Sequence, residues 1–415
     1  MFFLLFLLTP LALAVSSALA DSRTLVLYDS RLPEFTTQYS KLFQTLESKN
    51  FDLELGLVGP DSPSPDLFTN GFRRYQNILV LPTTSRDLVP TETLLQFVQD
   101  GGDVFVISDN KGIQTDVALF LNELGIFPSP KEYKYKDYHN GETLDDPEVQ
   151  NTVVLPSAKS ISYTDGSVAL LSNSELLVPV VRAPRTSYTV NVDEGRLSTD
   201  STWHSGSQGF LFVGFQGLNN ARVFWTGSSA SFHDASFNEE VVDALVNWTF
   251  QISGLIKATS TKHYNENGDA GYKIKDTTTY EIGLSHWNGD QWVPFKNRTD
   301  VQLEYVMLDP YYRLNLVPTR EENSSQIYST TFQIPDRHGM FTYKVLYQRD
   351  GYSFVDESTT VPVRHLANDE YPRSWEITNS WVYLSSALAV VIGWFAFVVL
   401  FVFSGNKHFD KEKTE

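Results

Sequence analysis

The chain has 415 residues, among them 50 acidic and 32 basic side chains, and its formal net charge is -18. Such an acidic chain excludes nucleic acid as a partner, because phosphate binding requires a basic surface. No cysteine is present, which excludes thiol nucleophiles, cysteine-ligated zinc and thiol redox chemistry. The length is sufficient for two or three domains, each with its own hydrophobic core.

An apolar run at the start of the sequence predicts a secretory signal peptide over residues 1–20. The run FFLLFLLTPLALAV leads to Ala18-Leu19-Ala20, an A-x-A cleavage pattern before Asp21. The segment lacks the usual basic residue, and an uncleaved anchor is the alternative interpretation. A cleaved signal would place the body of the chain in the lumen or outside the cell.

Residues 21–257 are predicted to form an α/β domain. Short apolar runs at 24–28, 52–58, 77–81 and 104–107 predict strands, and amphipathic segments within 33–49, 91–100 and 115–124 predict helices. This alternation indicates a parallel sheet with helices on both faces. Ligands of such sheets lie at the carboxyl ends of the strands, in the loops that begin at Asp29, Pro82 and Ser108. These loops contain no dinucleotide or P-loop motif. Their hydroxyls and amides either hold a sugar or belong to ordinary polar loops.

A β-rich insertion is predicted at about 140–205, where Ser, Thr and Val are frequent. Paired strands at 209–215 and 221–225 follow it, and a helix from Asn238 to about Ile252 returns the pattern to the α/β layer. Just before the insertion, KEYKYKDYH (131–139) interleaves lysines with tyrosines. This segment either contacts a glycan or pyrophosphate or forms an edge strand kept soluble by its lysines. The candidate glycan contacts are Lys134, Tyr135, Lys136 and Tyr138.

Residues 258–366 are predicted to form a β-sandwich of immunoglobulin-like size. Strand candidates occur at 272–280, 281–285, 301–308, 328–334 and 340–347, with turns at Asn288-Gly289-Asp290 and Asp350-Gly351. Three N-x-[ST] sequons begin at Asn247, Asn297 and Asn323, of which the first lies on a predicted helix and the others lie in polar loops. A linker at 367–380 then leads to the end of the chain.

A stretch without charges at 381–403 predicts one transmembrane helix, followed by a cytosolic tail at 404–415. Its length is sufficient to cross a hydrocarbon core of about 30 Å. Small residues lie on one face of this helix and would allow another helix to approach closely. These residues are Ser386, Ala389, Gly393 and Ala396. Lys411 and Lys413, five and three residues from the end, form a dilysine pattern typical of retrieval signals in the endoplasmic reticulum.

Motifs of catalysis are absent from the sequence. The patterns H-E-x-x-H, G-x-S-x-G and D-x-D do not occur, and the eight histidines show no metal-ligand spacing. We therefore predict no catalytic residue, metal or cofactor in this chain. A membrane-anchored lumenal carbohydrate-active enzyme and a cycling cargo receptor remain as alternatives to an assembly subunit.

Several ordered segments resemble one known family, the non-catalytic 48-kilodalton subunit of oligosaccharyltransferase (Wbp-type or DDOST-type). They are YQNILVL (75–81), FVQDGGDVFV (97–106), NNARVFWTGS (219–228), DVQLEY (300–305) with Asp309-Pro310, IPD (334–336), and Gly351-Tyr352. The resemblance covers nearly the whole chain, including the single span.

The resemblance implies a place in an endoplasmic reticulum complex that transfers a glycan from dolichyl diphosphate to Asn in N-x-[ST]. It implies that a separate multi-spanning subunit performs catalysis, with ribophorin-II-type (Swp) and DAD-type subunits as neighbours. It also implies an amidotransferase-like (flavodoxin-like, GIFT-type) α/β domain, although amidotransferases of that fold use a cysteine that this chain lacks. The expected role is assembly and positioning of the dolichol-linked glycan.

Overall fold

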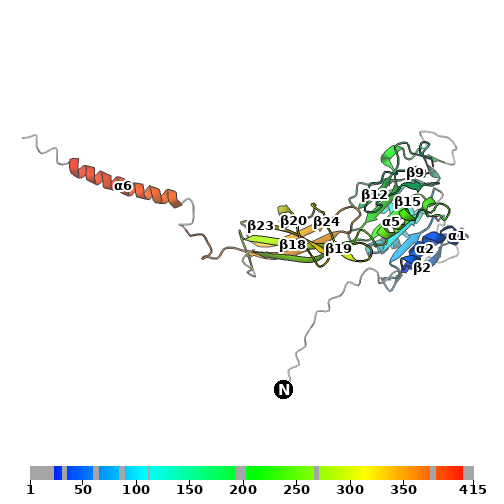
Figure 1. Ribbon diagram of the computed structural model, residues 1–415, viewed down its shortest axis with the longest axis horizontal. Coiled ribbons are helices and arrows are strands. Elements are labelled where there is room, and N and C mark those ends of the chain that lie inside the picture. The colour runs from blue at the N-terminus through cyan, green and yellow to red at the C-terminus, as the bar shows by residue number, and fades with distance from the viewer. Residues whose placement is uncertain are drawn as a thin grey trace, which may run out of the picture. The chain divides into compact units, whose positions relative to one another are not determined.

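The computed structural model describes residues 23–29, 35–58, 65–83, 89–110, 113–141, 143–191, 202–265, 271–373 and 380–404 (Figure 1). The predicted signal peptide and the tail with Lys411 and Lys413 lie outside these ranges.

The chain divides into two compact units. The first comprises Met1–Tyr264, Thr279–Thr331 and Thr342–Thr359, and the second comprises Asn265–Thr278, Phe332–Phe341 and Thr360–Glu415.

A nine-stranded sheet forms the centre of the α/β part of the chain. Its order is β2-β1-β5-β6-β15-β14-β11-β7, with β12 beside β14. The first five strands in this order are mutually parallel. They are β2 (Asp52–Val58), β1 (Arg23–Asp29), β5 (Asn77–Val80), β6 (Asp103–Ile107) and β15 (Arg222–Thr226). The four predicted strands up to residue 107 are therefore confirmed.

The other end of the sheet is antiparallel, so the sheet that was predicted to be parallel is mixed. A connection of five residues, 217–221, separates β14 from β15, and so short a connection allows only an antiparallel pair. The predicted pairing of 209–215 with 221–225 is confirmed. The strands of this end are β14 (Phe210–Gln216), β12 (Leu177–Arg182), β11 (Ala169–Leu171) and β7 (Ile126–Pro128).

Helices cover both faces of the sheet, as predicted. The side chain of Phe105 on β6 joins one buried apolar cluster, while its neighbours Val104 and Val106 join another. This alternation places the two clusters on opposite faces of the strand. Helices α2 (Ser40–Ser48) and α5 (Glu239–Thr249) contribute to the Phe105 cluster, and α3 (Thr91–Gln99) and α4 (Thr115–Glu123) to the other. A short helix, α1 (Phe35–Gln38), precedes α2.

The predicted insertion is rich in short strands, although β11 and β12 belong to the main sheet. Two small antiparallel pairs remain: β8 (Tyr133–Lys136) with β13 (Tyr188–Asn191), and β9 (Thr143–Asp145) with β10 (Ser160–Ser162). A further pair joins β3 (Phe68–Thr69) to β4 (Phe72–Arg73). The 3-10 helices η2 (Gly206–Gln208) and η3 (Ala230–Phe232) precede β14 and α5.

Two five-stranded sheets follow along the chain. One has the order β16-β18-β23-β22 with β19 beside β18, and the other has the order β17-β25-β24-β20-β21. The rings of Tyr280 on β18 and Tyr343 on β24 are stacked with centroids 5.4 Å apart, which brings the two sheets into contact. The first sheet is built from β16 (Ile256–Asn265), β18 (Thr277–Trp287), β19 (Trp292–Pro294), β22 (Val317–Glu322) and β23 (Ser325–Gln333). The second is built from β17 (Tyr272–Lys273), β20 (Gln302–Met307), β21 (Asp309–Asn315), β24 (Gly339–Tyr347) and β25 (Val355–Arg364).

The sequence pattern missed several of these strands. The two strands predicted at 272–280 and 281–285 are instead the short β17 and one long β18. Strands β21 and β22 lie at the edges of their sheets and are almost entirely exposed, so they show no alternation of apolar and polar residues. Strands β16 and β25 also went unpredicted, because hydroxyl and charged side chains dominate their sequences.

The last described element is the apolar helix α6 (Ser380–Ser404). It contains no charged side chain, and a helix of 25 residues is about 37 Å long. This length and composition suit a membrane crossing and agree with the span predicted at 381–403.

Candidate functional site

The carboxyl ends of the parallel strands meet at one edge of the sheet, where the sequence placed a possible ligand site. Thr83 Oγ1 donates to Asp29 Oδ2 at 3.3 Å, and both side chains are buried. Ser108 Oγ donates to the carbonyl of Thr226 at 2.9 Å. These hydroxyls therefore hold neighbouring strand ends together, which agrees with the interpretation of ordinary polar loops. Residues 30–31, 84–86 and 111–112 of the three loops lie outside the described ranges.

Tyr39, which is buried, and His233, which is half-buried, form a pair that the sequence did not indicate. The Tyr39 hydroxyl lies 2.8 Å from His233 Nε2, and the two residues are 194 positions apart. Burial raises the pKa of Tyr39 well above its ordinary value. Burial also lowers the pKa of His233, against the opposing charges of Asp109 and Asp234. The hydrogen bond therefore joins Tyr39 to an imidazole whose protonation is disfavoured by burial, and it links two distant segments of the chain.

Asp234 caps helix α2 from a distant segment of the chain. Its Oδ1 accepts a hydrogen bond from the backbone nitrogen of Lys41 at 2.9 Å, and its Oδ2 accepts from Ser40 Oγ at 2.5 Å. Burial acts to raise the pKa of Asp234, but these hydrogen bonds outweigh it and the pKa is lowered. The carboxylate occupies the positive end of α2, which leaves no free anion site there.

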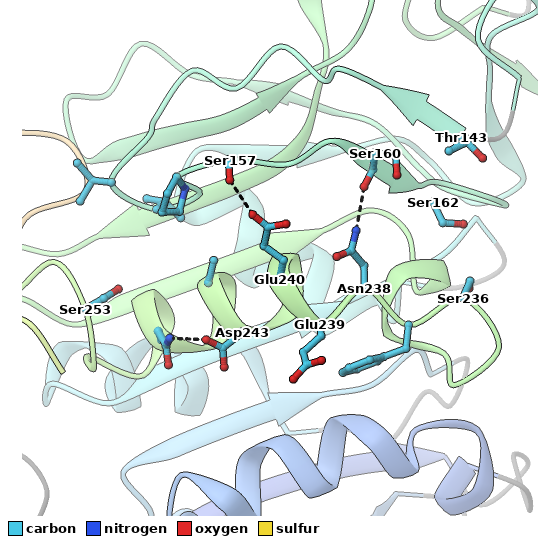
Figure 2. Close-up of a pocket in the computed structure, with 16 residues that line it drawn as sticks. Thr143, Ser157, Ser160, Ser162, Ser236, Asn238, Glu239, Glu240, Asp243 and Ser253 are labelled. Atoms are coloured by element: carbon cyan, nitrogen blue, oxygen red, sulfur yellow. Dashed lines mark hydrogen bonds between the residues drawn. The ribbon is translucent and has the colours of Figure 1, made fainter. Parts of the chain in front are cut away.

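A cavity lies along α5, opposite the β9–β10 insertion (Figure 2). Its volume is about 980 Å³, which is large enough for a small ligand. Three carboxylates of α5, those of Glu239, Glu240 and Asp243, line it together with the ring of Phe237. Six hydroxyl side chains complete its polar wall: Thr143, Ser157, Ser160, Ser162, Ser236 and Ser253.

Hydrogen bonds hold the two walls of this groove together. Ser157 Oγ donates to Glu240 Oε1 at 2.6 Å, and Asn238 Nδ2 donates to the carbonyl of Ser160 at 2.8 Å (Figure 2). The Asn238 Oδ1 atom also accepts from the backbone nitrogen of Val241 and so caps α5. One side-chain amide thus begins the helix and positions the insertion against it.

The KEYKYKDYH residues surround a smaller hollow of about 160 Å³. Lys134 forms an ion pair with Asp165, and Tyr135 is only 3% exposed, with its ring packed against Tyr163. Tyr138 is 76% exposed, and Lys136 lies on β8, whose pairing in a two-stranded sheet fits the edge-strand interpretation. Glycan contact by these four residues remains a prediction, and Tyr138 presents the accessible ring.

The three sequons differ in their surroundings. Asn297 and Asn323 are exposed and adopt positive φ angles of 58° and 45°. Asn247 is half-buried on α5, and its partner Thr249 is fully buried and donates to the carbonyl of Leu245 at 2.8 Å. The use of these sequons remains a prediction.

The remaining site predictions fall on α6 and on potential metal ligands. Ser386, Ala389, Gly393 and Ala396 all lie on the exposed helix α6, and a Cβ added at Gly393 would meet no atom within 4 Å. Among the described residues, no group of three or more His, Asp or Glu side chains is arranged to hold a metal ion.

Comparison with known families matches two domains of one protein type. Residues 15–252 match the OST48 N-terminal domain, and residues 258–405 match the OST48 middle domain. Subunit WBP1 of the dolichyl-diphosphooligosaccharide--protein glycosyltransferase of Saccharomyces cerevisiae is 41% identical, over 92% of this chain and 91% of the relative. Subunit wbp1 of Schizosaccharomyces pombe is 30% identical, over 85% and 86%. The 48 kDa subunit of Danio rerio is 29% identical, over 95% of both chains.

Among solved structures, the mmIFT52 N-terminal domain covers 55% of this chain and 96% of its own. Its TM-score is 0.38 and its sequence identity is 14%. Values this low support no assignment of a detailed fold.

Proposed function

Because the chain belongs to the OST48 family, whose members are subunits of the dolichyl-diphosphooligosaccharide--protein glycosyltransferase, we propose that it is a non-catalytic subunit of this complex. The observation that carries the proposal is similarity over the OST48 N-terminal and middle domains, the second of which includes the apolar helix. This similarity reaches 41% identity over 92% of the chain. The chain would thus assemble the complex and help to position the dolichol-linked glycan during N-glycosylation.

The described residues support a structural role. The groups with shifted pKa values form hydrogen bonds within the protein. Tyr39 is bonded to His233, and Asp234 accepts hydrogen bonds from Ser40 and Lys41. The buried Asp103 and Arg222 likewise bind partners within the fold. Catalysis accordingly belongs to a separate, multi-spanning subunit, and ribophorin-II/Swp-type and DAD-type subunits are the proposed neighbours.

The proposed topology is single-pass type I in the endoplasmic reticulum membrane. The apolar helix α6 follows the two folded parts, so both lie on the lumenal side if the predicted signal peptide is removed. In this proposal the α/β part is flavodoxin- and amidotransferase-like, supported by the parallel order β2-β1-β5-β6. The contact between Tyr280 and Tyr343 supports a β-sandwich at 258–366.

Affinity purification of the full-length chain from detergent-solubilised membranes tests the proposal. We expect recovery of a multi-spanning glycosyltransferase together with the smaller subunits. Transfer activity should accompany the complex and be absent from the separated chain. Recovery of a monomer that cleaves or transfers glycan by itself would overturn the proposal in favour of a carbohydrate-active enzyme.

A further inference from the structure

We propose that the groove along α5 binds an uncharged carbohydrate chain, an inference that rests on the proposed function and assigns part of it to named residues. The groove lies between α5 and residues 143–162 of the insertion, with the end of α2 nearby (Figure 2). Its volume of about 980 Å³ falls within the range of small-ligand sites, which is sufficient for several sugar rings.

Side-chain chemistry in the groove matches the hydroxyl groups of sugars. Carboxylates accept hydrogen bonds from such hydroxyls, whereas serine and threonine hydroxyls both donate and accept. The carboxylate of Glu239 is exposed and forms no hydrogen bond or ion pair with any residue that the structure describes. The Thr143 and Ser162 hydroxyls likewise have no side-chain bond within the described ranges, so all three side chains remain available to a ligand.

One aromatic ring adds an apolar surface to this polar wall. Phe237 is half-buried and lines the groove beside Asn238. The ammonium of Lys41 lies 5.8 Å from the centroid of the Phe237 ring. An aromatic face carries negative charge density that attracts the polarised C–H groups of a sugar ring. The combination of this ring with surrounding hydroxyls and carboxylates favours a polyol over a purely apolar ligand.

The charge of the groove argues against a phosphate ligand. Glu239 and Glu240 lie in the first turn of α5, where they offset the positive end of the helix. Asp243 forms an ion pair of 2.6 Å with Lys49 and accepts a hydrogen bond from Asn247 at 2.9 Å. The described lining thus holds three carboxylates and no basic side chain, and the two lysines beside it, Lys49 and Lys41, are bound to Asp243 and to the backbone carbonyl of Asp234. The groove is suited to the neutral sugar part of a lipid-linked glycan and not to its diphosphate.

A basic peptide is the competing ligand for a groove with this charge. Peptide binding in a groove commonly uses an open sheet edge or a continuous row of apolar anchors. In this groove the lining side chains are mostly hydroxyls, carboxylates and amides, and the insertion side is closed by the bonds from Ser157 and Asn238. These features favour carbohydrate, and a crosslinking experiment separates the two ligands.

The test is photo-crosslinking of the whole purified complex with a neutral mannose oligosaccharide that carries a photoreactive group. We expect labelled peptides from residues 236–253, mapped by mass spectrometry, and competition by the unlabelled oligosaccharide. Glu239→Ala should lower labelling of these peptides about tenfold, because a hydrogen bond to a charged group is lost. The matched control is Glu92→Ala, which removes an exposed carboxylate from the first turn of α3 and should leave labelling unchanged.

Recovery of the other subunits with each variant separates this inference from the proposed function. A complex that assembles normally but is never labelled on α5 would refute the glycan groove and leave the subunit assignment intact. Loss of labelling on addition of a lysine-rich peptide, but not of free oligosaccharide, would identify a peptide site instead. An equal loss of labelling in Glu92→Ala and Glu239→Ala would show that the effect arises from helix stability, and it would also refute the inference.

Discussion

Trp248 Nε1 donates a hydrogen bond to the carbonyl oxygen of Gly351 at 2.8 Å. The donor lies on α5 of the α/β part, and the acceptor lies in the turn between β24 and β25. The guanidinium of Arg222 covers the Trp248 ring at 4.9 Å from its centroid. Because both side chains are fully buried, this contact ties segments more than 100 residues apart into one compact unit.

Replacing Arg222 by methionine should strongly destabilise the chain. Its guanidinium donates to the carbonyls of Trp248 and Ser253 at 2.7 Å each, and to that of Gly254 at 2.9 Å. Removal leaves one buried and two partly buried carbonyl acceptors without this donor, at a cost of about 3–5 kcal/mol in the free energy of unfolding. Thermal unfolding of the full chain in detergent measures this cost.

The control for this change is Arg313→Met, which removes an ion pair with Glu304. The Arg313 side chain is 62% exposed, so the effect should stay within about 0.5 kcal/mol. Similar losses in both variants would show that Arg222 has no special role in the core.

The stability of the chain should fall as the pH rises through neutrality because of Asp103. Burial raises the pKa of Asp103 to about 7, although hydrogen bonds from Gln251 and from the backbone of Arg222 act in the opposite direction. An unfolded carboxyl has a pKa of about 3.9, so the folded state binds the proton more tightly. This contribution is fully present below the unfolded pKa and is lost as the pH rises through the folded pKa.

The measurement compares the unfolding of the wild-type chain with that of Asp103→Asn, which keeps an oxygen acceptor but does not titrate. Between about pH 5 and pH 7, the wild type should lose up to about 1.4 kcal/mol per pH unit relative to the variant. Parallel pH curves for the two proteins would contradict the raised pKa.

Glycosylation should occur at Asn297 and Asn323 and not at Asn247 in the assembled protein. Trp248 and Thr249 of the Asn247 sequon are fully buried, and α5 holds their backbone in a helix. A glycan on Asn247 would also enter the groove that Asn247 lines. Mass spectrometry of each sequon peptide, before and after enzymatic deglycosylation, checks this expectation, and a glycan found on Asn247 in the mature complex would disprove it.

Gly393→Leu should reduce the recovery of partner subunits without preventing membrane insertion. A Cβ added at this position would meet no atom within 4 Å beyond its own stretch of the helix, so we expect the larger side chain to act by blocking the approach of another helix. The matched control is Val391→Leu, on roughly the opposite side of the helix at about 100° per residue. Equal recovery of partners with both variants would mean that α6 serves only as an anchor.

Changing both Lys411 and Lys413 to serine should let an unassembled chain leave the endoplasmic reticulum. Removal of the dilysine pattern removes a signal that receptors read on a cytosolic tail. Acquisition of late Golgi modifications on the glycans at Asn297 or Asn323 measures the escape. Unchanged retention would mean that the span or lumenal partners hold the chain in the endoplasmic reticulum.

Local sequence patterns predicted much of the α/β part and little of the edges in the β-rich part. Strand β6 is an apolar run buried on both faces, and α5 has the apolar period of an amphipathic helix. The residue pattern of each element therefore indicates which of its faces are buried. Strand β21 begins with Asp309-Pro310 and is exposed on both faces. Its strand conformation comes from pairing with β20, which its own residues do not encode.

The candidate site was less predictable than the fold. The Tyr39–His233 pair joins residues 194 positions apart, and the bonds across the groove join Glu240 to Ser157 and Asn238 to Ser160, 83 and 78 positions apart. The sequence instead pointed to Tyr135 as a glycan contact, but the fold buries its ring against Tyr163. Alternation of tyrosine and lysine indicates a strand but does not say which face meets the core.

The sequence by itself determined the acidic charge, the absence of cysteine, the apolar span and the family. Each of these depends on composition, on a local run of residues or on ordered motifs. Tertiary structure alone decided the mixed character of the sheet, the packing of Arg222 against the Trp248 ring and the position of the groove. These features depend on contacts between segments that lie far apart in the chain, whereas periodicity records only the burial of neighbouring residues.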